Sequence, residues 1–411
     1  MGITENILFY RARLVELFCL SIFIVSLPSF EAPKNIFYVT YIVVWVFNRL
    51  VFSQSRFSWS LWDLLFFIWV LSGFLVAAIS NQGLNEWDGS LDLLRYISVG
   101  WLVYRSQYNH RVLTALLVLI LGSTFFGAIY SFYLLDGKYF NLYSVGHINH
   151  SAIYYAIISG LALSLGVSFW KNFNWVQRVS VFFGVSIFFY FVIQTESRGS
   201  ILPLFLIFTP LFALALKYLY KNLLTYLILF TVIMFSIAYA NDLPVVKKLG
   251  KIYDSGIINM SSRARSINSG LLIWRAYPIS GVGLENLGDF MTKEKLKNIA
   301  NNFGLPFSEQ KYYVGPHAHN IYANTLAERG IIGFTPLFLI LIYWLFLLAK
   351  DRPSKEKSLH EVAAWGGALS AFCAVTIGGL FNTTLHHEHG SLAILLLGIW
   401  LASRNYTKTT K

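Results

Sequence analysis

Residues 331–349 read IIGFTPLFLILIYWLFLLA, nineteen residues without a charged side chain. An α-helix needs about 20 apolar residues to cross the hydrocarbon core of a bilayer, with a range of about 17–25. The stretch therefore predicts a transmembrane helix. Similar stretches recur in both directions along the chain, so they decide the fold class together.

Twelve candidate membrane spans are found by working outward from this stretch. The fourth is short and contains Asp92 and Arg95, which are three residues apart and are expected to pair. The sequence thus predicts an all-α polytopic membrane protein with about twelve transmembrane helices. The spans cover residues 14–30, 36–52, 61–80, 91–104, 112–135, 152–170, 179–195, 200–218, 223–240, 331–349, 362–381 and 391–403.

The composition agrees with a membrane protein. Hydrophobic residues make up 56% of the chain and charged residues only 13%, whereas soluble domains carry about 25% charged residues. The net charge of +12 could indicate a nucleic-acid partner, but the basic residues lie in short clusters between apolar runs, so we expect none. Cys19 and Cys373 lie inside apolar runs, which excludes a disulfide framework.

The basic residues also predict the topology. With the N-terminus in the cytoplasm, seventeen Lys and Arg residues fall on the cytoplasmic side and three in the short outer loops. This arrangement predicts transmembrane helices one to nine in residues 1–240, a folded periplasmic loop over residues 241–330, and helices ten to twelve in residues 331–411. Both chain ends are then cytoplasmic.

The strongest local signal lies just before the opening stretch. Residues 316–320 read PHAHN, and nine further residues lead to Gly330 and Gly333. If the segment is helical, His319 and both glycines share one face, which the glycines allow to pack closely against a neighbour. An imidazole can take a proton from a sugar hydroxyl near neutral pH. We predict His319 as a catalytic base, with His317 as a further candidate; the alternative is a structural interfacial histidine.

Arginines near the outer face form a second signal. Arg198 lies between two spans on the side that the positive-inside trend leaves poor in cations, and a guanidinium suits phosphate. It could instead pair with Glu196 or extend to the interface. Arg263 and Arg265 lie in the long loop, where a helix would direct only one of them into a site. A solvated basic loop is the alternative for this pair.

A further histidine-rich segment, residues 386–389, precedes the last span and reads HHEH. Without a second ligand group at a recognisable spacing we expect no metal here, and His386 is predicted to contact the acceptor instead. The chain contains neither a P-loop motif nor His-Glu-x-x-His, so we expect no cofactor.

The pattern His319-Asn320, nine residues, Gly330-x-x-Gly333 resembles the signature of the O-antigen ligase family (WaaL), part of the wider O-antigen ligase/polymerase (Wzy_C-like) superfamily. The segment around Arg198 resembles the family's arginine before a membrane span. The stretch from Arg263 to residues 278–283, PISGVG, resembles the family's Arg…Pro-x-x-Gly-x-Gly pattern. The family's tryptophan four residues after that arginine is replaced here by Ile267, so Arg263 and Arg265 both remain candidates.

The resemblance implies a GT-C-type glycosyltransferase architecture with about twelve helices and one long periplasmic catalytic loop. It implies transfer of O-antigen from undecaprenyl pyrophosphate to a sugar hydroxyl of lipid A–core, inverting and metal-independent, at the periplasmic face of a Gram-negative inner membrane. His319 would act on the acceptor hydroxyl, and Arg198 with Arg263 or Arg265 would hold the pyrophosphate. The supporting residues would be Asn320, Gly330, Gly333, His317 and His386.

Other functions use a similar set of groups. An O-antigen polymerase (Wzy) joins units on the same lipid carrier, and a protein O-oligosaccharyltransferase of the superfamily usually carries a further C-terminal periplasmic domain, which we do not expect here. A transporter would more often show two related halves, and the sequence shows no such similarity. We therefore predict an O-antigen ligase whose partners are the lipid-linked glycan donor, the lipid A–core acceptor and membrane lipids.

Overall fold

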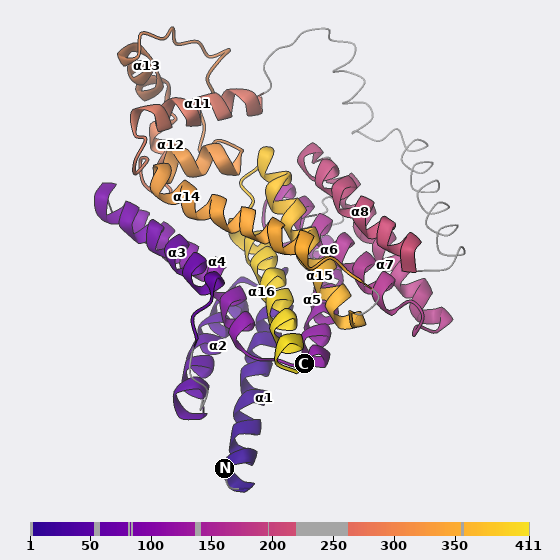
Figure 1. The fold of residues 1–411 in the computed structure, drawn as a ribbon. Coiled ribbons are helices and arrows are strands. Elements are labelled where there is room, and N and C mark those ends of the chain that lie inside the picture. Colours follow the sequence, from indigo (N-terminus) through magenta and orange to yellow (C-terminus); the bar gives the residue numbers. More distant parts are fainter. Residues whose placement is uncertain are drawn as a thin grey trace, which may run out of the picture.

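The structure is a computed structural model that describes residues 3–52, 58–80, 83, 85–135, 141–195, 197–218, 262–354 and 357–410. All regular elements among these residues are helices, arranged as a bundle with a smaller unit at the top of Figure 1. The helices are α1 (Ile3–Ser26), α2 (Glu31–Phe52), α3 (Leu61–Ser80), α4 (Asn85–Arg105), α5 (His110–Leu134), α6 (Ile148–Phe169), α7 (Trp175–Gln194), α8 (Arg198–Tyr218), α11 (Ser262–Ala276), α12 (Leu287–Phe290), α13 (Lys293–Asn302), α14 (Ile321–Lys350), α15 (Leu359–Thr376), η1 (Gly378–Leu380) and α16 (His387–Thr410).

The predicted spans correspond well to these helices. Each of the eleven spans that fall on described residues overlaps one helix, while the ninth, residues 223–240, lies outside the described residues. Within the described part, seven helices are long and apolar enough by themselves to cross a membrane. The chain is thus a multi-pass membrane protein, and the total of twelve spans and the GT-C arrangement remain predictions.

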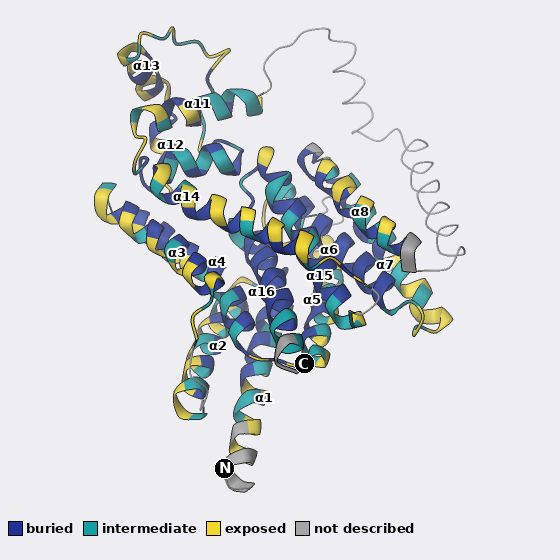
Figure 2. Ribbon diagram, viewed as in Figure 1, coloured by how far each residue is buried: buried dark blue, intermediate teal, exposed yellow. Residues whose placement is uncertain are grey.

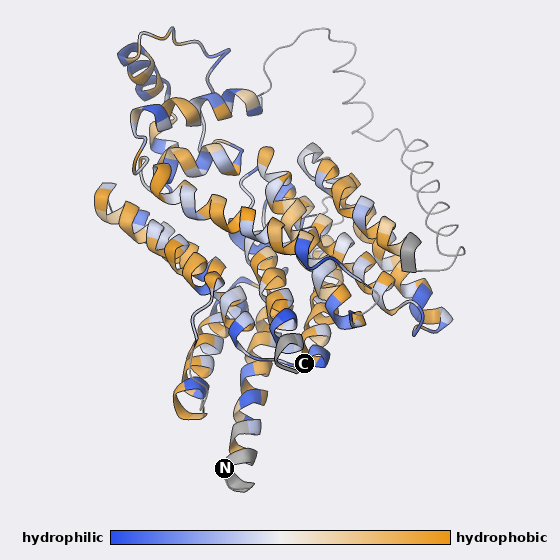
Figure 3. Cartoon of the chain, in the orientation of Figure 1, coloured by the Kyte–Doolittle hydropathy of each residue, from blue (hydrophilic) through white to orange (hydrophobic). Residues whose placement is uncertain are grey.

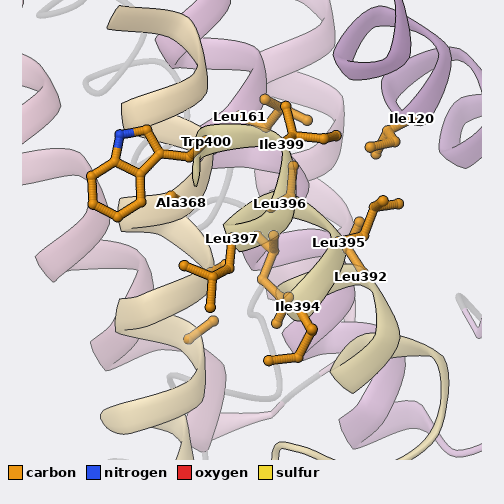
Figure 4. Packing of buried hydrophobic residues seen from close by; sticks show 14 of the residues in the cluster. Ile120, Leu161, Ala368, Leu392, Ile394, Leu395, Leu396, Leu397, Ile399 and Trp400 are labelled. Carbon is orange, nitrogen blue, oxygen red and sulfur yellow. The ribbon is translucent and has the colours of Figure 1, made fainter. Parts of the chain in front are cut away.

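Three helices form the centre of the bundle. In the most apolar stretch of α6, 94% of the residues are buried, and in that of α15 78% are buried. These helices therefore contact protein on nearly all sides. Every residue of α16 from Leu392 to Ala402 is buried. Figure 4 shows how side chains of α16 pack among Ile120 of α5, Leu161 of α6 and Ala368 of α15. The helix that the sequence places last is therefore part of the core.

Peripheral helices expose their apolar side chains. Val39, Val43, Phe47 and Leu50 follow one another along a face of α2, and all four are exposed. Figures 2 and 3 show the same combination of exposure and hydrophobicity along α3. A soluble monomer rarely leaves such a continuous apolar face in water, and a lipid environment explains it.

The contact between α4 and α16 depends on two glycines. A methyl group placed on Gly100 would lie 2.2 Å from the carbonyl oxygen of Ile394, and one on Gly398 would lie 2.1 Å from that of Gly100. Helices can approach this closely only where the side chain is absent. Nearer the site, the same pairing places the ring of Tyr96 in α4 at 5.9 Å from that of His386, which directly precedes α16.

The long loop before α14 contains a folded cap, which we define as residues 262–320. It contains α11, α12 and α13 and has an apolar core of its own that includes Ile273, Leu287 and Leu296. The buried Glu86 at the start of α4 accepts a hydrogen bond from Nδ2 of Asn286, 2.5 Å away, which ties the cap to the bundle. The predicted folding of this loop is confirmed from residue 262, and residues 241–261 lie outside the described part.

Candidate active site

The main site motif begins in a turn and not in a helix. The expectation that His319 lies on one helical face with Gly330 and Gly333 is wrong, because α14 starts at Ile321 and His319 has a positive φ of 49°. Positive φ is uncommon outside glycine and is maintained only where the surroundings require it. His319 is therefore held just ahead of the helix, at the boundary between the cap and the bundle.

Asn320 explains how this turn is held. Its side-chain oxygen accepts hydrogen bonds from the backbone N–H groups of Tyr322 and Ala323, so it is the N-cap of α14. Its Nδ2 donates to the carbonyl oxygen of Leu380 in η1 at 3.0 Å. One side chain thus starts the helix and attaches it to the segment that leads to His386.

Gly330 interrupts α14, with φ 55° and ψ −153°. The turn of residues 278–283 enters this break: Val282 and Gly283 donate to the carbonyl oxygens of Ala327 and Glu328, and Pro278 and Ile279 accept from the N–H groups of residues 331 and 332. A methyl group on Gly330 would lie 2.2 Å from the carbonyl oxygen of Ile279. Two motifs that the sequence separates by about fifty residues therefore form one backbone-bonded unit.

Gly333 has a different function from Gly330. A methyl group placed on it would lie 2.3 Å from Cβ and 2.9 Å from Nε of Arg329. The missing side chain leaves a channel along α14 in which the arginine side chain lies. Arg329 is 5% exposed, so it is an unusual buried cation in the first third of this helix.

The two loop arginines diverge, as their spacing on a helix predicts. Arg263, on α11, approaches the start of α8: a methyl group on Gly199 would lie 3.5 Å from its Nη1. Nη1 of Arg265 instead donates to the carbonyl oxygen of Glu309, 2.8 Å away within the cap. The structure brings Arg263 toward the backbone of residue 198, whose side chain lies outside the described part of the chain.

Histidines from three segments gather beside this turn. The ring centroids of His317 and His319 are 4.1 Å apart, those of His386 and His387 are 3.7 Å apart, and that of His150 is 5.1 Å from His387. The predicted candidates His317, His319 and His386 thus lie in one region. Among the described residues, no three His, Cys, Asp or Glu side chains are arranged to hold a metal ion.

The surroundings favour neutral imidazoles at this site. Burial, followed by the charges of His317, Arg263 and His147, lowers the pKa of His319 to about 4. Burial also lowers the pKa of His317, and it lowers the pKa of His386 to about 3. At neutral pH the ring of His319 can therefore accept a proton or a hydrogen bond.

A cavity of about 380 Å³ opens between α3, α4, α14 and the turns that carry His317 and His386. This volume falls within the range of about 300–1,000 Å³ that is typical of small-molecule sites. Acidic and aromatic side chains line it, including Asp92, Glu285 and Tyr96. Asp92 also forms the predicted ion pair with Arg95, at 3.4 Å.

Several lining residues were missed by the sequence analysis. Arg329 and Glu328 precede Gly330 directly, and a charged pair at the start of an apolar span was the signal that could have identified them. Glu285 gave no such signal. Burial, followed by the charges of Asp92 and Asp88, raises the pKa of its carboxyl group.

Comparison with known proteins identifies the segment that contains this turn. Residues 183–338 match a family model described as O-antigen ligase. The match includes the second half of α7, α8, the cap and the first part of α14, and it confirms the resemblance to the O-antigen ligase/polymerase superfamily. It indicates a ligase- or polymerase-type membrane enzyme that acts on polysaccharide or lipid-linked substrates. No curated protein matches the chain.

Proposed function

Taking the O-antigen ligase match over residues 183–338 as the premise, we propose that the protein transfers O-antigen from undecaprenyl pyrophosphate to a sugar hydroxyl of lipid A–core. The site faces the periplasm of a Gram-negative inner membrane, and both chain ends are cytoplasmic. One observation carries the proposal: the turn before α14, which Asn320 caps, holds His319 where the charge of Arg263 lowers its pKa, and Arg263 itself approaches Gly199 at the start of α8. A base beside a phosphate-binding cation is what this transfer requires.

The proposed chemistry is a single displacement. The acceptor hydroxyl transfers its proton to His319 while its oxygen forms a bond to the anomeric carbon of the donor glycan. The bond between that carbon and the pyrophosphate oxygen breaks, so the configuration at the carbon inverts. His319 removes one proton per transfer and later releases it to solvent, which typically contributes about 10²–10⁴-fold to the rate.

The arginines stabilise the leaving group. Charge develops on the pyrophosphate oxygen as its bond to the sugar breaks, and fixed cations in a dry site lower the energy of that state. We assign this task to Arg263 and Arg198. The bond from Arg265 to Glu309 supports a role in shaping the cap and not in holding phosphate.

A transfer assay with the purified chain tests the proposal. It combines an undecaprenyl-pyrophosphate glycan with rough lipopolysaccharide in EDTA, and compares the wild type with His319→Ala. His360→Ala, which removes a histidine from the predicted cytoplasmic side, is the matched control. We expect banded lipopolysaccharide from the wild type and the control, and a loss of about 10²–10⁴-fold in His319→Ala with donor binding intact.

The products distinguish the alternatives. Longer lipid-linked chains without lipopolysaccharide product would replace the ligase assignment with a polymerase, because both enzymes use the same donor. Transfer to a protein acceptor would indicate an oligosaccharyltransferase. Absence of any transfer, with the donor bound, would overturn the glycan-transfer proposal itself.

A further inference from the structure

Two chemically different regions adjoin the histidine turn. One contains Arg263, which approaches Gly199 and whose charge lowers the pKa of His319. The other is the 380 Å³ cavity, which His317 lines. Since the two histidine rings are 4.1 Å apart, a group in the cavity and a group at Arg263 can both approach the same pair of imidazoles. Two substrates that must meet at a base require such an arrangement.

The cavity contains hydrogen-bond donors that the protein leaves unused. Nη1 of Arg329 and Nε1 of Trp69 are both buried without a hydrogen-bond partner, and both residues line the cavity. Arg329 is 5% exposed and Trp69 is 2% exposed. Unpaired buried donors are rare because each one forfeits its bonds to water. Eight buried side-chain atoms among the described residues lack a partner, and these two belong to residues that line the cavity, where a ligand would supply acceptor oxygens.

Hydrogen-bond acceptors line the same cavity. They are the carboxyl groups of Asp92, which also pairs with Arg95, of Glu285, and of Glu328, the neighbour of Arg329 in the chain. Three carboxyl groups against one guanidinium disfavour an anionic ligand. A sugar fits both sets, because each hydroxyl can donate to a carboxylate and accept from a guanidinium or an indole.

We propose that this cavity binds the acceptor sugar, and that Arg329 and Trp69 select a neutral, polyhydroxylated residue through its hydroxyl oxygens. The inference rests on the proposed glycan transfer, for which it names the acceptor subsite. Gly333 contributes to the same subsite, because its missing side chain leaves the space that the Arg329 side chain occupies beside the cavity. The donor pyrophosphate then occupies the Arg263 side of the histidine turn.

Arg329→Met is the first test. Methionine keeps most of the length and removes the buried guanidinium, whose charge interacts with that of the neighbouring Glu328, so the thermal midpoint in detergent is measured to show that the variant is folded. We expect the KM for rough lipopolysaccharide to rise by about 10- to 100-fold, while the KM for the donor stays unchanged. Arg275→Met, which removes an exposed arginine of the cap, is the control and should change none of these values.

Trp69→Phe is the second variant, because it removes Nε1 with little change in shape and should also raise the acceptor KM. Unchanged acceptor KM in both variants would overturn the inference, even if the wild type transfers glycan normally. A binding assay independent of transfer uses the core oligosaccharide released from rough lipopolysaccharide by mild acid. Binding to the wild type that is lost in Arg329→Met supports the subsite, and equal binding to both proteins overturns it.

The class of sugar has a test of its own. Glucose and glucuronate are added separately as competitors in the oligosaccharide-binding assay. Stronger competition by glucose agrees with a neutral sugar. Stronger competition by glucuronate would overturn that assignment and make Arg329 an anion site. Failure of the wild type to transfer glycan contradicts the proposed function, whereas these binding results decide the subsite separately.

Discussion

At the scale of single residues, His319 combines two properties that conflict. A neutral imidazole can accept a proton, but a pKa lowered to about 4 makes it a weak base in the free enzyme. The donor resolves this conflict, because the negative charge of a bound pyrophosphate favours the protonated imidazole and raises its pKa. His319 therefore becomes a stronger base only after the donor has bound.

The pH dependence of transfer follows from this argument. Because its pKa is lowered, His319 stays unprotonated and able to act as a base until the pH falls to about 4. The value of kcat/KM for the donor should therefore fall near pH 4 and not near pH 6.5. The acid limb of kcat should lie at higher pH, because it reports the donor-bound enzyme. Initial rates between pH 3.5 and 8 would measure both limbs.

Arg263→Gln provides the control for the electrostatic part of this prediction. Removing the cation should move the acid limb of kcat/KM to higher pH, since the arginine charge is one of the causes that lower the pKa of His319. An acid limb of kcat/KM that moved to lower pH in Arg263→Gln would contradict this explanation. Acid limbs of kcat and kcat/KM that both lay at about pH 6.5 in the wild type would also contradict it.

At the scale of elements, the close contact of α4 with α16 positions the site. Gly398→Ala should be destabilising by about 1–3 kcal/mol, because the new methyl group would lie 2.1 Å from the carbonyl oxygen of Gly100. Gly184→Ala in α7, where the new methyl group meets nothing within 4 Å, is the matched control and should be neutral or slightly stabilising. Thermal unfolding midpoints of the two variants in the same detergent would measure the difference. Equal midpoints would show that the helices can separate freely.

At the scale of the whole molecule, the charge distribution predicts which end faces the periplasm. Cys19 and Cys373 are buried, so a cysteine introduced at an exposed site can be labelled with little background. Lys297→Cys, in the cap, should react with a membrane-impermeant maleimide in intact spheroplasts. Arg352→Cys, after α14, should react only after the membrane is made permeable. The reverse pattern would place the cap and the histidine turn in the cytoplasm.

The arrangement in Figure 1 agrees with this orientation. The cap lies at one end of the bundle, while α1 and the C-terminal end of α16 lie in the lower half of the view. The histidine turn is thus at the end of the molecule that the sequence assigns to the periplasm. A lipid-linked donor can reach a site at this end of the molecule without crossing the bilayer.

The sequence by itself determined the class of the molecule and most of its helices. Apolar stretches of about 20 residues can be satisfied only as membrane helices, so composition and spacing alone predict them. It also suggested His319, Asn320, Gly330 and Gly333 as candidates, because residues close in sequence carry a local pattern. The sequence could not predict the role of each glycine, because Gly330 packs against Ile279 and Gly333 packs against the side chain of Arg329.

Only the tertiary structure decided how distant segments share the site. The turn of residues 278–283 enters the break in α14, Arg263 approaches Gly199 while Arg265 turns into the cap, and Asp92 faces the same cavity as Arg329. Contacts between segments more than forty residues apart depend on helix packing, which leaves no periodic signal in a single sequence. The unpaired donors of Arg329 and Trp69 became visible for the same reason: a missing partner can be recognised only when all the neighbours are known.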